Sequence, residues 1–144
     1  RYRSRPSITA LFGRLLRADA EAHANLPQPL ITPASMLSES LRSEFGDKRL
    51  LDFGLGIEPG RFEFHKTHCI APTPLVLAYA LAVVTSGNAA RILMAGFDGY
   101  PAGDLRNDDT AKILASFFDS SNTELFSITP TSHPMRSTSL YGIL

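Results

Sequence analysis

The segment RILMAGFDGY, residues 91–100, decides the fold that we expect for this chain. After Arg91 it continues as an unbroken apolar run to Phe97. Such a run is typical of a central parallel strand that is covered on both faces. The run gives way to Asp98, Gly99 and Tyr100, where small and polar residues replace the apolar ones. We therefore predict a buried strand with a polar loop at its carboxyl end.

Helices and strands alternate on both sides of this strand. Thr73 and Pro74 supply an N-cap and a proline at the first position of a helix that is apolar nearly all round. Further elements are predicted as a strand at 61–66, a helix at 74–86, a helix at 109–119 and a strand at 125–128. This order contains a βαβαβ run. It predicts an α/β fold of three-layer, Rossmann-like type with a mostly parallel sheet.

The N-terminal part of the chain adds helices at 7–24 and 33–45 and a strand at 49–55. We find no repeat and no domain boundary, so residues 1–144 are predicted to form one domain. The residues predicted to be largely buried are Leu75, Leu77, Leu81, Val84, Ile92, Met94 and Phe117.

Composition narrows the classes of partner. Fourteen Lys and Arg residues balance fourteen Asp and Glu residues, so the net charge is zero. A neutral chain has no general attraction to nucleic acid or to anionic membranes, and we expect neither as a partner. The longest apolar run, 75–84, is too short to cross a bilayer, and a cytoplasmic location is expected. Because Arg1 stands where an initiator Met would be, we expect a C-terminal fragment of a longer protein.

Four polar residues lie at, or just after, the carboxyl ends of the predicted strands. Ligands of open parallel sheets bind beyond the carboxyl ends of the strands. We expect Asp98, Tyr100, His65 and His133 to face one cleft there, with Asp98 accepting hydrogen bonds from a sugar or ribose hydroxyl. The alternative is that Asp98 caps its own turn, that Tyr100 packs on Pro101 and that both histidines bond to backbone atoms.

Two basic residues are candidates for binding an anionic group. Lys66 lies beside His65 and before the predicted helix start, and Arg136 follows the last predicted strand. His68 and Cys69 add zinc-ligating atoms near His65, but their spacing is not that of a zinc site, so no metal is expected. The chain has no nucleophile elbow, dinucleotide fingerprint or phosphate-binding Walker loop, and no cofactor is predicted.

Cys69 is the single cysteine of the chain, which excludes an internal disulfide. Because it lies near two histidines, a thiol nucleophile stays open beside a structural interpretation.

Several stretches together resemble a known family. They are LDFG at 51–54, FHKT at 64–67, AYALA at 78–82, AGFDGY at 95–100, SITPT at 127–131 and SLYG at 139–142. This combination resembles the C-terminal domain of aldolase-like proteins from bacterial surface-polysaccharide gene clusters, over most of residues 49–143. Those proteins join it to an N-terminal TIM-barrel domain similar to 4-hydroxy-2-oxovalerate aldolase and HMG-CoA lyase.

The resemblance implies an accessory, non-barrel domain of an aldolase-like protein in lipopolysaccharide or capsule biosynthesis. The parent would be a lyase whose catalytic residues lie in the barrel and outside this chain. The domain would bind a sugar, a nucleotide sugar or a partner protein. The resemblance also implies that the barrel of the same polypeptide is one partner. A homo-oligomer is left open.

The helix followed by AGFDGY is also similar, more loosely, to bacterial sialyltransferases and to the hydroxymethylpterin diphosphokinase-like family. That similarity implies, as an alternative, a glycosyltransferase-like or pyrophosphokinase-like domain acting on a nucleotide-activated substrate. The chain departs from those families at Pro72-Thr73-Pro74, where they tend to have Gly or Ser. This segment offers few free N–H groups to a diphosphate.

Overall fold

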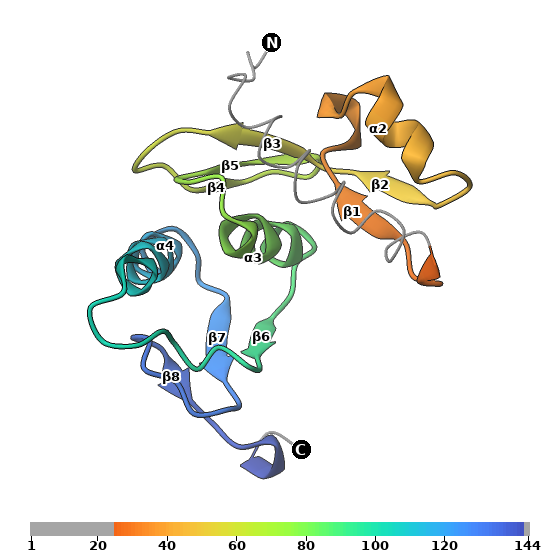
Figure 1. Cartoon of the computed structure of the whole chain (residues 1–144). Coiled ribbons are helices and arrows are strands. Elements are labelled where there is room, and N and C mark those ends of the chain that lie inside the picture. The colour runs from red at the N-terminus through yellow and green to blue at the C-terminus, as the bar shows by residue number, and fades with distance from the viewer. Residues whose placement is uncertain (1–24, 143–144) are drawn as a thin grey trace.

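The structure, a computed structural model, describes residues 25–142, and Figure 1 shows the arrangement of their elements. The helix predicted at 7–24 lies outside the described residues. In chain order the described elements are β1 (Leu30–Thr32), a 3-10 turn (Ala34–Met36), α2 (Glu39–Glu44), β2 (Leu50–Asp52), β3 (Gly54–Ile57), β4 (Glu63–Phe64), β5 (His68–Ala71), α3 (Val76–Ser86), β6 (Arg91–Met94), α4 (Leu105–Ser120), β7 (Glu124–Ser127), β8 (Arg136–Ser137) and a second 3-10 turn (Leu140–Gly142).

The described strands pair in three small sheets. Their orders are β1-β2, β3-β5-β4 and β6-β7-β8, and every neighbouring pair except β4 and β5 is parallel. The α/β class and the predominance of parallel pairs are therefore confirmed. A single Rossmann-like sheet with helices on both faces is not confirmed. In Figure 1, α3 and α4 lie between the sheet of β3, β5 and β4 and the sheet of β6, β7 and β8.

The unit β6–α4–β7 follows the predicted strand–helix–strand pattern. β6 and β7 are parallel neighbours in a register that pairs Met94 with Ser127, and α4 forms the crossover between them. The helix begins at Leu105, four residues earlier than predicted. The cause is Asp104, whose carboxylate accepts a hydrogen bond from the Arg106 N–H at 2.9 Å and so caps the first turn.

The strand predicted at 61–66 is largely wrong. Only Glu63 and Phe64 are in a strand, and β4 runs antiparallel to a neighbour, β5, which was not predicted. β5 lies in the middle of its sheet, and Cys69, Ile70 and Ala71 are almost completely buried. An apolar run of three residues is too short to show a period, so the sequence pattern did not reveal this strand.

The buried core lies around α3 and α4. Leu81, Met94 and Phe117 are buried as predicted, and Leu77 and Ile92 are partly buried. Leu75 and Val84 were predicted to be buried, but each is 39% exposed. The reason is that, among the described elements, α3 packs mainly on β4, β5 and α4, so these elements cover only one side of the helix.

β6 is also less enclosed than its apolar sequence predicts. Among the described strands it pairs only with β7, at the edge of the sheet, and Leu93 is 40% exposed. Within residues 25–142, no helix is long and apolar enough to cross a membrane.

Candidate functional site

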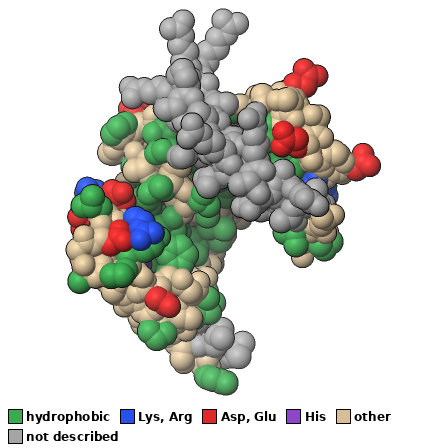
Figure 2. Space-filling model, in the orientation of Figure 1, with side chains coloured by type: hydrophobic (Ala, Val, Ile, Leu, Met, Phe, Trp, Pro, Cys, Tyr) green, Lys and Arg blue, Asp and Glu red, His purple; other side chains and the backbone are tan. Residues whose placement is uncertain are grey.

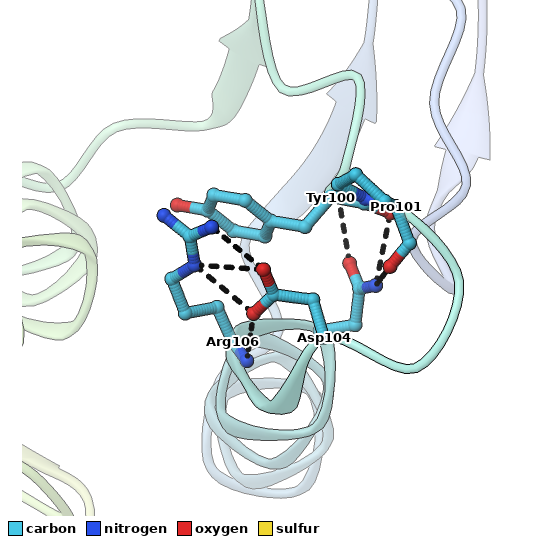
Figure 3. A network of polar contacts seen from close by, with 5 residues as sticks. Tyr100, Pro101, Asp104 and Arg106 are labelled. Atoms are coloured by element: carbon cyan, nitrogen blue, oxygen red, sulfur yellow. Dashed lines mark hydrogen bonds and ion pairs between the residues drawn. The ribbon is translucent and has the colours of Figure 1, made fainter.

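A loop of ten residues connects β6 to α4 and carries the candidate site. Gly96, Gly99 and Gly103 in this loop have positive φ angles of 74°, 107° and 84°, which residues with a Cβ rarely adopt. Asn107, in the first turn of α4, holds the loop through its side-chain amide. The Asn107 Oδ1 accepts the Tyr100 N–H at 2.9 Å, and Nδ2 donates to the Tyr100 and Pro101 carbonyls at 3.0 and 3.2 Å (Figure 3).

The ring of Tyr100 is held by an ion pair at the start of α4. The Arg106 guanidinium lies over the ring, 4.0 Å from its centroid, and its Nη2 is 2.6 Å from Asp104 Oδ2 (Figure 3). The hydrogen bonds from Arg106 lower the pKa of the Asp104 carboxyl to about 2, so the pair is charged at neutral pH. Tyr100 therefore has one face covered by a cation that is itself fixed by the helix cap.

The loop after β7 is hydrogen-bonded to the loop after β6. Ser132 donates both its N–H, at 2.9 Å, and its hydroxyl, at 3.1 Å, to the Asp98 carbonyl. The Thr129 hydroxyl accepts the Gly96 N–H at 3.0 Å. A Cβ on Gly99 would lie 1.9 Å from the Ser132 Oγ, so only glycine permits this approach. The two strand-end loops form one structure because Gly99 leaves room for Ser132.

A cavity of about 280 Å³ lies where these loops meet. Its walls are formed by Gly96, Phe97, Asp98, Gly99, Tyr100, Thr110 and His133. His133 is only 7% exposed, and its imidazole makes no hydrogen bond to any described residue. The Asp98 carboxylate is exposed and likewise has no hydrogen bond or ion pair within the described part of the chain. The ring nitrogens of His133 are not fully enclosed, so they can form hydrogen bonds with a ligand in the cavity.

The structure brings together three of the four residues that the sequence predicted to share a cleft. Asp98, Tyr100 and His133 line the cavity, which lies beyond the carboxyl ends of β6 and β7. The prediction that His133 lies near Asp98 rested on consecutive parallel strands being neighbours, and β6 and β7 are. Tyr100 was expected there because it leaves the same strand as Asp98, with Gly99 between them.

His65, the fourth residue, does not line this cavity, and the prediction that it does is wrong. His65 and Lys66 lie in the tight turn between β4 and β5, in a different sheet. The His65 ring stacks on His68 with centroids 4.4 Å apart, and its Nε2 is 3.1 Å from Glu63 Oε2. His65 does not reach the cavity of Asp98 because β4 runs antiparallel to β5 and does not belong to the sheet of β6.

Arg136 lies on the other side of His133. It begins β8, and its guanidinium is 5.6 Å from the Phe126 ring centroid. Together with Phe118, Pro134 and Met135 it lines a shallow hollow of about 470 Å³ that His133 also borders. Arg136 is therefore near His133 but outside the cavity with Asp98.

A second, larger cavity of about 650 Å³ lies between α3 and β6 and was not predicted. Apart from Tyr100 and Thr110, its side chains are all apolar: Leu75, Val76, Leu77, Ala80, Leu81, Val84, Ile92, Leu93, Met94, Ala95, Phe97 and Ile113. Phe97, Tyr100 and Thr110 line both cavities. The sequence signal was present in the apolar character of α3 and β6, but it indicates burial and not a hollow.

Cys69 and the histidines near it do not form a reactive centre. Cys69 has no exposed surface, and desolvation raises the pKa of its thiol to about 12. A thiol of this kind is protonated at neutral pH and is a poor nucleophile. Within residues 25–142 no group of three or more His, Cys, Asp or Glu residues could hold a metal ion.

The arrangement at Asp98 and His133 suits a ligand that has several hydroxyl groups. A carboxylate accepts hydrogen bonds, and a neutral imidazole both donates and accepts one. The glycines beside Asp98 allow a ligand to approach the backbone closely.

A scan against protein-family models found no match, and searches of curated proteins and of solved structures found no similar protein.

Proposed function

We propose that this chain is a sugar-binding domain, with the ligand held between Asp98 and His133. The observation that supports the proposal most is that a buried imidazole and an exposed carboxylate, both without partners among residues 25–142, line one cavity beyond the ends of β6 and β7. In Rossmann-like sheets, ligands usually bind in crevices at the carboxyl ends of the parallel strands. We propose that the sheet of this chain belongs to a Rossmann-like arrangement in the parent protein.

The wider role that we propose comes from the family resemblance. The chain would be the non-barrel part of an aldolase-like lyase that acts in surface-polysaccharide biosynthesis, and the ligand would be a sugar or a nucleotide sugar. The part of the chain that the structure describes offers no metal group and no reactive thiol. This supports a binding role for the domain, with the aldol chemistry assigned to the barrel.

A transferase acting on a nucleotide-activated sugar is the second candidate. It is favoured by the position of His133, because an imidazole in the cavity could accept the proton of an attacking hydroxyl. The two functions differ in outcome, since a transferase releases a nucleotide from its donor and a binding domain does not.

The binding proposal is tested by thermal unfolding with a panel of monosaccharides, nucleotides and nucleotide sugars. A ligand present at a hundredfold excess over its Kd stabilises the fold by about 2.7 kcal/mol. We expect at least one sugar to raise the unfolding temperature, and Asp98→Asn to remove this rise. Asp109 is an exposed carboxylate on α4 that does not line the cavity, so Asp109→Asn is the matched control. This variant should show the same rise in unfolding temperature as the unchanged protein.

Two outcomes would count against the proposal. If no sugar or nucleotide sugar shifts the unfolding temperature, the domain does not bind this class of ligand. If Asp98→Asn and Asp109→Asn behave alike, the ligand binds elsewhere. Release of free nucleotide from a nucleotide sugar would favour the transferase.

A further inference from the structure

The uncovered surface of α3 and β6 is unusually apolar. Leu75, Val76, Val84 and Leu93 are between 39% and 57% exposed, although they come from the two most apolar segments of the chain. In Figure 2 hydrophobic side chains gather in the middle of the face shown, over the region of α3 and β6. Large exposed apolar patches mark binding sites more often than they mark idle surface.

This surface is concave and lies beside the polar cavity. The hollow of about 650 Å³ falls within the size range of small-molecule sites. Phe97, Tyr100 and Thr110 line both the hollow and the cavity of Asp98 and His133, so the two spaces are adjacent. A ligand whose polar end meets Asp98 and His133 therefore has apolar surface next to it, along α3 and β6, for its other end.

We propose that the two cavities form one bipartite site for a glycoside whose aglycone is apolar. The inference rests on the proposed sugar-binding function and names the class of sugar that fits. The sugar hydroxyls would meet Asp98 and His133, and an aliphatic or aromatic aglycone would lie against Leu77, Val84 and Leu93.

The lining of the hollow is the reason for choosing an apolar aglycone and not a nucleotide base. Among the described residues that line it, only Tyr100 and Thr110 have polar side chains, and both also line the polar cavity. The edge of a base carries donors and acceptors that would lose their hydrogen bonds to water on entering such a hollow. An alkyl chain or an aryl ring loses none.

The test compares glycosides that differ only in the aglycone. Methyl, butyl and hexyl β-glycosides of glucose, galactose and N-acetylglucosamine would be titrated by calorimetry. Burial of one methylene group is expected to tighten binding about fourfold, so affinity should rise steeply from methyl to hexyl for the sugar that binds. Equal affinities along all three series would overturn the inference.

A variant that fills the hollow gives the matched control. Ala80 lines the hollow on an exposed part of α3, whereas Ala115 is exposed on α4 and does not line it. Ala80→Phe should remove the gain in affinity from the longer alkyl group, while Ala115→Phe should keep both that gain and the affinity for the methyl glycoside. Circular dichroism checks the fold, and Ala80→Met is the milder substitution if Ala80→Phe does not fold. If a folded Ala80 variant still binds the longer alkyl glycosides more tightly, the alkyl group binds elsewhere on the protein.

Asp98→Asn separates this inference from the function on which it rests. If glycosides bind in an Asp98-dependent way but chain length has no effect, the sugar site stands and the apolar half is wrong. If affinity rises with chain length but Asp98→Asn changes nothing, the sugar site itself is wrong, and the bipartite site fails with it. A concentration-dependent dimer that Ala80→Phe dissociates would show that a second copy occupies the hollow, which also overturns the proposal.

Discussion

Gly99 is the residue on which the geometry of the candidate site depends most directly. Its φ of 107° is unfavourable for any residue with a Cβ, and that Cβ would overlap the Ser132 Oγ. We expect Gly99→Ala to cost about 1–3 kcal/mol of unfolding free energy and to weaken ligand binding, because alanine is strained at this φ and the Ser132 hydroxyl must move away from Asp98. Gly103→Ala is the control, since Gly103 also has a positive φ but has no atom within 4 Å of an added Cβ. Urea unfolding should show a larger loss for Gly99→Ala, and equal losses would contradict the close-approach argument.

For Cys69 the structure favours a structural role over the role of a thiol nucleophile. Burial raises the pKa of its thiol to about 12 from an ordinary value of 9.0. We expect a thiol reagent at pH 8 to modify Cys69 only as fast as the protein unfolds. The stability contributed by the protonated thiol is complete below pH 9 and is lost as the pH rises from 9 towards 12, because the unfolded chain releases the proton first. Rapid modification of the folded protein would restore the thiol-nucleophile hypothesis.

At the scale of elements, α3 has one side in the core and one side at a hollow. Leu81 is 3% exposed and belongs to the core, whereas Leu75, the N-cap residue of α3, is 39% exposed at the hollow. We expect Leu81→Ala to lower the unfolding free energy by about 2–5 kcal/mol. Leu75→Ala should cost less than about 1 kcal/mol, because the removed atoms are already in contact with water. The pair is compared by urea unfolding, and similar losses would mean that both sides of α3 are covered.

The loop from β6 to α4 shows how elements position chemistry. Asp104 caps α4, Arg106 holds the Tyr100 ring, and Asn107 fixes the loop backbone. All three lie at the start of one helix, so the orientation of α4 and that of the cavity wall are linked. These contacts within the chain hold the loop in place, which reduces the cost of ordering it on binding.

At the scale of the whole molecule, the accessory role proposed above leads to a prediction about activity. Because the resemblance assigns the catalytic residues to the barrel, we expect the chain alone to cleave no 4-hydroxy-2-oxoacid, with or without added divalent metal ions. A coupled assay for released pyruvate would measure this. A turnover that Asp98→Asn abolishes would contradict the accessory role and assign catalysis to the cavity.

The sequence by itself determined the class of the fold and most of the local structure. Apolar periodicity located α3, α4, β6 and β7, and the polar residues after β6 and β7 identified three members of the site. These features are local, since they depend on residues within a few positions of one another. Which strands become neighbours was decided only by the tertiary structure. Strand pairing joins residues far apart in the chain, so no local pattern showed that β5 would take β4 as an antiparallel partner and carry His65 to another sheet. The apolar residues of α3 and β6 predicted burial, which is a local signal. The hollow between them depends on how these distant segments pack, so only the tertiary structure showed it.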